Sequence, residues 1–182
     1  AAATTLAVMK LYEMGRLELD APLGRYLPEL DTFDKADIPI VHLLTHTARL
    51  QPLIPFYLAP IEKSRRRIVP KPDIYRPEPM EDYQVPITSR IFMHQAYMDS
   101  MRYRIWTSPL RSSREYRYSD LGFYLLTDVV ERLSGTTLDV FLNRHFYTPM
   151  GLERTLFTPW REESVKAIPP TEEDRYFRQE RV

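Results

Sequence analysis

Arg117-Tyr118-Ser119-Asp120 and the apolar stretch after it, residues 121–133, are the part of the sequence that most clearly predicts structure. Apolar residues recur there at every fourth position, which predicts a helix with one buried stripe: Leu121, Leu125, Val129 and Leu133, widened by Phe123, Leu126 and Val130. Ser119 or Asp120 can cap the first turn, and Gly135 can end the helix in a left-handed conformation. A tyrosine and two polar side chains therefore lie at an anchored helix start, which suits a reactive group, although such a sequence often serves only as a cap.

Four more helices are expected along the chain. Residues 1–14 form a first helix that ends at Gly15, with one apolar face made of Leu6, Met9, Leu11 and Tyr12. This helix begins without a capping residue, so we expect that the chain has been cut upstream of it. A short helix is predicted at 41–47, and further helices at 87–103, with Thr88 or Ser89 as the cap, and after Thr136 or Thr137, where the apolar spacing is again helical. Few strands are expected.

The segment 52–86 has a different composition. It holds eight of the sixteen prolines and the basic run at 65–67. Proline removes backbone donors and restricts the residue before it, so long regular elements are not expected. We interpret 52–86 as a proline-rich surface insertion with a short hairpin around Ile68 and Val69. The alternative is a substrate lid or a partner-binding surface. Residues 159–182 are interpreted as a charged tail within one single domain, 1–182.

Composition excludes several classes of function. The 25 basic and 25 acidic residues cancel, which gives no electrostatic case for binding nucleic acid. Without cysteine there can be no disulfide, no thiol nucleophile and no cysteine-based zinc site. His42 and His46 have the four-residue spacing used in zinc proteases, but Leu43 replaces the expected glutamate and no third ligand is apparent. We therefore predict no metal and no cofactor.

Four segments in the same order carry a family resemblance. They are 7–23, the Leu-Leu-Thr-His-Thr segment at 43–47, the Tyr-Ser-Asp-Leu-Gly-Phe segment at 118–123, and 135–152 with its Pro-Met-Gly-Leu turn. Together they resemble the serine β-lactamase-like superfamily, which covers class C β-lactamases, penicillin-binding D-alanyl-D-alanine peptidases and related esterases. Ala48-Arg49 replaces the Ser-Gly that usually follows the histidine segment. The segment 52–86 and the charged tail more weakly resemble lactamase-like modules fused behind glycosidases.

The resemblance implies a mainly α fold: the helical subdomain of a β-lactamase/transpeptidase-like protein, with a long proline-rich insertion and little sheet. It implies that Tyr118 and Asp120 are the catalytic residues, with Asp120 standing where the family has asparagine. An ionised aspartate only accepts hydrogen bonds, whereas asparagine also donates them. The family's nucleophile lies in a Ser-x-x-Lys motif, which these 182 residues do not contain. We therefore interpret the chain as an inactive fragment of a serine acyl hydrolase.

The resemblance also implies a small-molecule or peptidoglycan-like substrate for the whole enzyme and a periplasmic or extracellular location. Self-association is expected through apolar residues of the first helix, including Leu6, Val8 and Met9, which would be exposed in a fragment. The alternative function is a non-catalytic module that binds peptidoglycan or a protein partner through 52–86.

Overall fold

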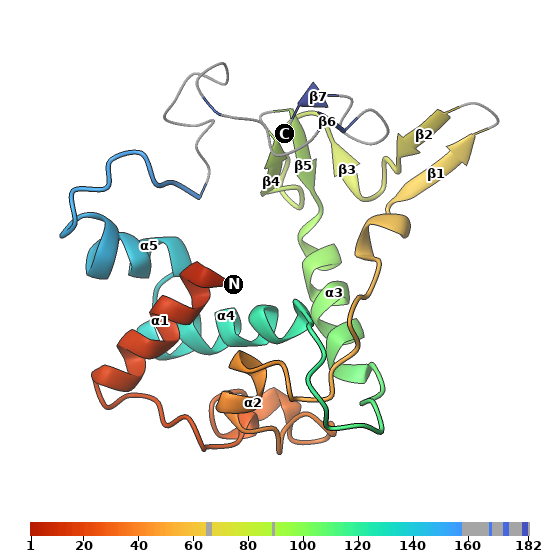
Figure 1. Ribbon diagram of the computed structural model, residues 1–182. Helices are drawn as coiled ribbons and strands as arrows, with labels where there is room; N and C mark the ends of the chain where they lie inside the picture. Colours follow the sequence, from red (N-terminus) through yellow and green to blue (C-terminus); the bar gives the residue numbers. More distant parts are fainter. Residues whose placement is uncertain (65–66, 89, 158–167, 169–172, 175–179, 182) are drawn as a thin grey trace. The chain divides into compact units, whose positions relative to one another are not determined.

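The protein is described from a computed structural model, which places residues 1–64, 67–88, 90–157, 168, 173–174 and 180–181 (Figure 1). It divides into two compact units. The helical unit comprises Ala1–Ile54 and Arg102–Thr155, and the second unit comprises Pro55–Met101 and Leu156–Val182. The α-helices are α1 (Ala2–Glu13), α2 (Ile40–Leu44), α3 (Gln95–Thr107), α4 (Leu121–Ser134) and α5 (Leu138–Leu142). The strands are β1 (Ile61–Ser64), β2 (Arg67–Pro70), β3 (Tyr75–Arg76), β4 (Val85–Thr88), β5 (Ile91–Met93), β6 (Glu173–Asp174) and β7 (Glu180–Arg181).

Helix α4 is the centre of the helical unit, and α1, α2 and α5 all pack against it (Figure 1). The predicted stripe is confirmed, except that Leu133 is only half-buried. Seven residues of α4 are buried: Leu121, Gly122, Phe123, Leu125, Leu126, Val129 and Val130. Each fully buried leucine or valine contributes roughly 1.5–3 kcal/mol. Gly135 ends the helix at φ +71°, as predicted.

The start of α5 is tied to the end of α4 by one side chain. The predicted cap, Thr137, precedes α5 but makes no capping bond with its side chain. Instead, the carboxylate of Glu131 on α4 accepts the backbone N–H of Leu138 at 3.0 Å. This bond satisfies one of the N–H groups that a helix start leaves unpaired. It fixes where the second helix begins relative to the first.

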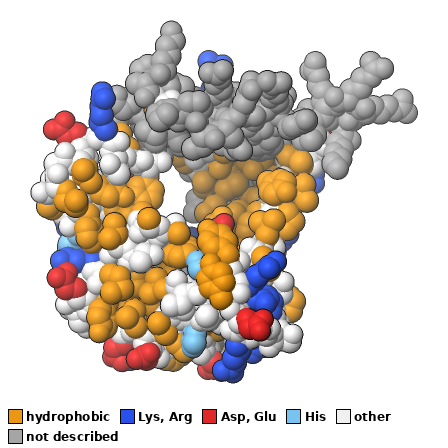
Figure 2. All heavy atoms as spheres, in the orientation of Figure 1, with side chains coloured by type: hydrophobic (Ala, Val, Ile, Leu, Met, Phe, Trp, Pro, Cys, Tyr) orange, Lys and Arg blue, Asp and Glu red, His pale blue; other side chains and the backbone are white. Residues whose placement is uncertain are grey.

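Helix α1 is present where it was predicted, and of the three residues expected to be exposed, Leu6 and Met9 are exposed but Val8 is not. Ala7, Val8 and Leu11 are fully buried, whereas Leu6 and Met9 are more than 40% exposed. Both sides of this helix are apolar, so periodicity alone could not select the side that packs on α4 and α5. Val8 is therefore not part of an exposed patch. On the face drawn in Figure 2, hydrophobic side chains reach the surface of the helical unit.

The predicted helix at 87–103 is wrong over nearly its first half, because α3 begins only at Gln95. Its beginning forms two strands instead, because β5 pairs antiparallel with both β3 and β4 in a three-stranded sheet of order β3-β5-β4. Ile91-Phe92-Met93 is a β-branched and aromatic run that suits such pairing. Helix α3 begins at Gln95, and the cap is His94, whose Nδ1 accepts the backbone N–H of Ala96 at 3.1 Å. Thr88 belongs to β4, and Ser89 lies outside the described residues.

The second unit also contains the hairpin expected near Ile68 and Val69. Strands β1 and β2 pair antiparallel, with Lys63 opposite Ile68 and Glu62 opposite Val69. Strands β6 and β7 form a further short pair. That 52–86 is an insertion stays a prediction, and most of the predicted charged tail, 159–182, lies outside the described residues. Over the described ranges the protein is mainly helical with small sheets, as expected. None of the helices placed by the structure has the length and apolar character that crossing a membrane would require.

Candidate functional site

Tyr118 and Asp120 are hydrogen-bonded to each other just before α4. The Tyr118 hydroxyl donates to the Asp120 carboxylate at 2.7 Å. This bond and the negative charge of Asp120 raise the pKa of the Tyr118 phenol above its ordinary value. Half of the Tyr118 side chain is exposed, so its ring can be reached from solvent. The two residues predicted to be catalytic are therefore brought together, in an arrangement that holds the phenol in its protonated form.

Ser119 lies between them but is directed into the protein. It is only 3% exposed. Its hydroxyl donates to the backbone carbonyl of Gln51 at 2.7 Å and accepts the backbone N–H of Leu121 at 3.3 Å. Of the two capping candidates, Ser119 is thus the one whose side chain bonds the first turn of α4, since Asp120 makes no capping bond. The Ser119 hydroxyl therefore anchors the motif, residues 117–120 before α4, and does not face solvent.

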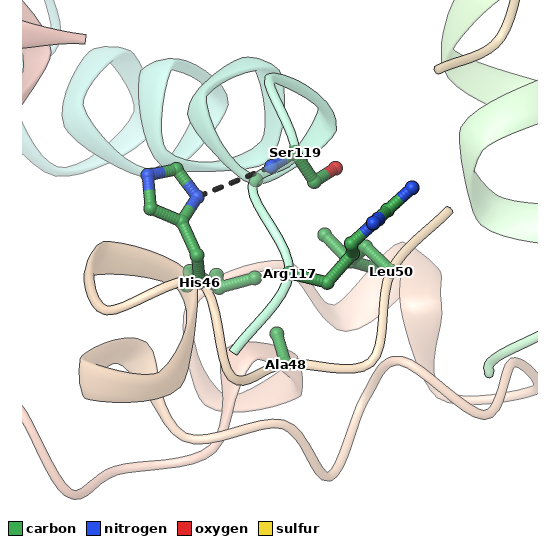
Figure 3. Close-up of a pocket in the computed structure, with 7 residues that line it drawn as sticks. His46, Ala48, Leu50, Arg117 and Ser119 are labelled. Atoms are coloured by element: carbon green, nitrogen blue, oxygen red, sulfur yellow. Dashed lines mark hydrogen bonds between the residues drawn. The ribbon is translucent and has the colours of Figure 1, made fainter. Parts of the chain in front are cut away.

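His46 supports the same motif from the turn after α2. Its Nδ1 accepts the Ser119 backbone N–H at 3.3 Å, the bond drawn in Figure 3, and its carbonyl accepts the Arg117 N–H at 3.0 Å. Its ring centroid lies 4.6 Å from that of Tyr118 and 5.8 Å from that of Tyr116. The α4 residue Phe123 adds a third ring at 5.6 Å. The histidine therefore contacts the motif through its backbone and its side chain.

In the sequence, His46 stands out by its four-residue spacing from His42 and by its place in the Leu-Leu-Thr-His-Thr segment. The structure gives the two histidines separate roles, because His42 Nδ1 lies 2.6 Å from the Thr47 hydroxyl. Among the described residues, no three His, Asp or Glu side chains are grouped so that they could hold a metal ion. The contact between His46 and Ser119 spans 73 residues, and no periodicity reports a contact of that kind. The only available signal was that both residues fall in segments that resemble one family.

The turn that carries His46 has an unusual backbone. His46 and Arg49 have φ values of +56° and +63°, in the left-handed region that few residues other than glycine adopt. Arg49 occupies the position where the family resemblance leads us to expect glycine. Two bonds hold it there: its Nε donates to the Arg111 carbonyl, and its own carbonyl accepts the Arg111 N–H at 2.7 Å. The turn therefore keeps a glycine-like conformation without a glycine.

Among the described residues of the helical unit, the hollow beside the motif is very small. It has a volume of about 10 Å³ and is lined by Leu43, His46, Ala48, Leu50, Arg117, Ser119 and Gly122 (Figure 3). A space of this size holds at most about one water molecule. It is a packing gap behind the motif and not a substrate pocket.

A larger hollow, of about 400 Å³, contains two ion pairs. Arg132 bonds Glu29 at 2.7 Å, and Arg102 bonds Asp128 at 3.1 Å. Burial raises the pKa of the Asp128 carboxyl, and the nearby Arg102 opposes that effect. None of the predicted site residues lines this hollow.

Comparison with known proteins places these features in a family context. The family model described as Beta-lactamase matches residues 2–175. The N-acetylmuramyl-L-alanine amidase of Bacillus subtilis (strain 168) is 27% identical over 163 residues, which cover 86% of this chain and 31% of that protein. The D-alanyl-D-alanine-carboxypeptidase/endopeptidase AmpH of Escherichia coli (strain K12) is 25% identical over 161 residues, which cover 86% of this chain and 34% of that protein. This chain therefore spans about a third of the length of the curated relatives it matches.

Solved structures show the same fold at lower identity. The octameric penicillin-binding protein homologue from Pyrococcus abyssi superposes with a TM-score of 0.57 at 19% identity, covering 92% of this chain and 33% of that one. The β-lactamase/D-alanine carboxypeptidase from Yersinia pestis gives a TM-score of 0.54 at 20% identity, covering 86% and 38%. At these identities the likeness concerns the fold alone. The helical unit, with its motif at the start of α4, is thus part of a known architecture.

Proposed function

This chain belongs to the Beta-lactamase family, and from that premise we propose that it supplies the tyrosine-bearing part of the active site of a serine acyl hydrolase. The two curated relatives are named for cleaving amide bonds of muramyl and D-alanyl compounds. We propose a substrate of the same chemical class, an acyl group of peptidoglycan type, for the protein to which these residues contribute. A periplasmic or extracellular location goes with that substrate.

The observation that carries this proposal is the placement of Tyr118. Its ring is half-exposed, while the residue after it is buried and bonded on both sides by Gln51 and Leu121. A phenol that is accessible but attached to a fixed backbone meets the geometric requirement for a general acid or base, which must be held within hydrogen-bond reach of the reacting group. We propose that Tyr118 transfers the proton during acyl transfer.

Asp120 sets a limit on that role. Its carboxylate accepts the Tyr118 hydroxyl and raises the pKa of the phenol, so the phenolate form is disfavoured. Tyr118 is therefore better suited to donating a proton than to removing one. The carboxylate cannot donate to a substrate amide oxygen, as the asparagine of similar proteins can. We propose that the protein acts better on esters, or acts weakly, compared with relatives that carry asparagine.

The nucleophile is not assigned to any residue of this chain. No Ser-x-x-Lys sequence occurs in it, and the Ser119 hydroxyl is engaged in two bonds. A serine hydroxyl needs an adjacent base to attack a carbonyl efficiently. The competing function, a binding module that acts through 52–86, requires no nucleophile at all. Fusion to a glycosidase and self-association through Leu6 and Met9 stay predictions.

The test separates the two functions in two steps. The gene that encodes these residues is read for a Ser-x-x-Lys run in frame with them, which the hydrolase requires and the binding module does not. In a protein that has the run, Tyr118→Phe should lower turnover of a p-nitrophenyl ester by roughly 10²-fold or more, as loss of an acid–base group typically does. Tyr103→Phe, which also removes one exposed phenol hydroxyl, is the matched control and should stay within about twofold. Equal turnover in both variants would remove Tyr118 from the mechanism.

A further inference from the structure

One residue of the turn after α2, His46, makes three different contacts with the motif before α4. His46 accepts the Ser119 N–H at Nδ1, accepts the Arg117 N–H at its carbonyl, and places its ring 4.6 Å from the ring of Tyr118. Its backbone φ of +56° is one that few residues adopt. A residue held in such a conformation with three contacts to one motif calls for an explanation beyond packing.

We propose that His46 is a positioning residue for Tyr118: its imidazole, protonated only at Nε2, holds the Ser119 amide and supports the tyrosine ring, and a second proton on the imidazole releases both. The role deepens the proposed function, because it concerns the same tyrosine. His46 touches no reacting atom in this scheme and acts only through the motif.

The chemistry of the imidazole determines the protonation state. A backbone N–H can only donate, so Nδ1 must carry a lone pair for the bond drawn in Figure 3. The neutral ring then has its proton on Nε2. In the doubly protonated ring both nitrogens are donors, so Nδ1–H and the Ser119 N–H face each other without an acceptor. The contact changes from attraction to repulsion when one proton is added.

Aromatic rings contact the His46 ring, and charged groups lie near it, although the Arg117 side chain points away from it (Figure 3). Tyr116 and Tyr118 present aromatic rings that can stabilise a cation. Asp120 is hydrogen-bonded to Tyr118 and adds a negative charge near the ring, whereas Arg117, in the same segment before α4, adds a positive charge. Phe123 packs from α4 without a charge. His42 on α2 is bonded to Thr47 rather than to the motif.

The experiment follows three NMR signals of the full 182-residue chain between pH 8 and pH 5: the Ser119 amide, the Tyr118 ring protons and the His46 ring. Long-range ¹H–¹⁵N spectra should show His46 protonated at Nε2 alone near neutral pH. As the pH falls, the Ser119 and Tyr118 signals should move with the same midpoint as the His46 ring. Hydrogen exchange of the Ser119 amide, corrected for the intrinsic effect of pH, should become about tenfold faster, the order expected when one hydrogen bond is lost.

Two variants separate positioning from mere packing. His46→Asn keeps an acceptor oxygen near the Nδ1 position, and asparagine tolerates positive φ, but it does not titrate. It should retain slow Ser119 exchange and lose the pH dependence of the Ser119 and Tyr118 signals. His42→Asn removes the neighbouring histidine and should leave that dependence intact.

Some results would overturn the inference. They are an Nδ1-protonated ring at neutral pH, a Ser119 amide that ignores the titration of His46, or pH dependence that persists in His46→Asn. If that variant does not fold, the wild-type titration still decides. None of these measurements uses hydrolysis, so a negative result would leave the proposed function standing, and the Tyr118→Phe turnover test would decide that function separately.

Discussion

Replacing Ser119 with alanine tests whether this serine anchors the motif. The substitution removes the donor to the Gln51 carbonyl and the acceptor of the Leu121 N–H, which lie 2.7 and 3.3 Å from the hydroxyl. Loss of a capping oxygen typically costs about 1 kcal/mol. A carbonyl left without its donor costs about 1–2 kcal/mol, the lower part of the usual range, because Gln51 is only partly buried. We therefore expect Ser119→Ala to lower the free energy of unfolding by about 2–3 kcal/mol.

The assay is urea unfolding followed by circular dichroism at 222 nm, which reports the helices. Ser113→Ala is the matched control, because the Ser113 hydroxyl also accepts one backbone N–H, that of Glu115 at 3.1 Å, but at an exposed site. It should change the free energy of unfolding by less than about 0.5 kcal/mol. If Ser119→Ala costs no more than Ser113→Ala, the two bonds are not the anchor described above, and Ser119 becomes available again as a reactive hydroxyl.

Three further outcomes are expected. Asp120→Asn should lower the pKa of Tyr118, measured by NMR of labelled tyrosine, because the variant removes the negative charge that raises it; an unchanged pKa would argue against the bond between them. Burial raises the folded-state pKa of Asp128, so the folded chain binds this proton more tightly than the unfolded chain, and stability should rise as the pH falls through that pKa. Asp128→Asn should therefore flatten this part of the stability profile, while Glu153→Gln, at an exposed site, should not. The isolated chain should hydrolyse neither a chromogenic cephalosporin nor a p-nitrophenyl ester above background, and penicillin found on Ser119 by mass spectrometry would contradict that expectation.

The elements with one clear apolar period were predictable from the sequence. Helix α4 follows from the four-residue spacing of its leucines and valines, and the glycine after it marks its end. Helix α1 was located correctly and Leu6 and Met9 are exposed as expected, but the burial of Val8 was not predicted, because both sides of the helix are apolar. Selecting between two apolar sides requires knowledge of the neighbouring helices. Burial, unlike helix formation, is decided by those neighbours.

Short apolar runs were not predictable in the same way. Ile91-Phe92-Met93 lies near the start of the helix predicted at 87–103 and fits a helical pattern as well as it fits a strand. Its pairing with β3 and β4 makes it a strand. The proximity of Tyr118 and Asp120 could be expected, since they are two residues apart. Their hydrogen bond could not, because it depends on side-chain rotamers. The contact of His46 with Ser119 depends on the tertiary fold as a whole.

The left-handed turn at Arg49 bears on how such sites are searched for. A search by residue type looks for glycine at this position and finds arginine, although the backbone has the torsion angles that glycine would adopt. A positive φ costs arginine about 1 kcal/mol of conformational free energy, and the two hydrogen bonds between Arg49 and Arg111 offset that cost. The contacts around Arg49, and not its residue type, therefore determine the backbone conformation of this turn. Compared by torsion angles, this turn would match a turn that carries glycine, whereas compared by residue type this one position is a mismatch.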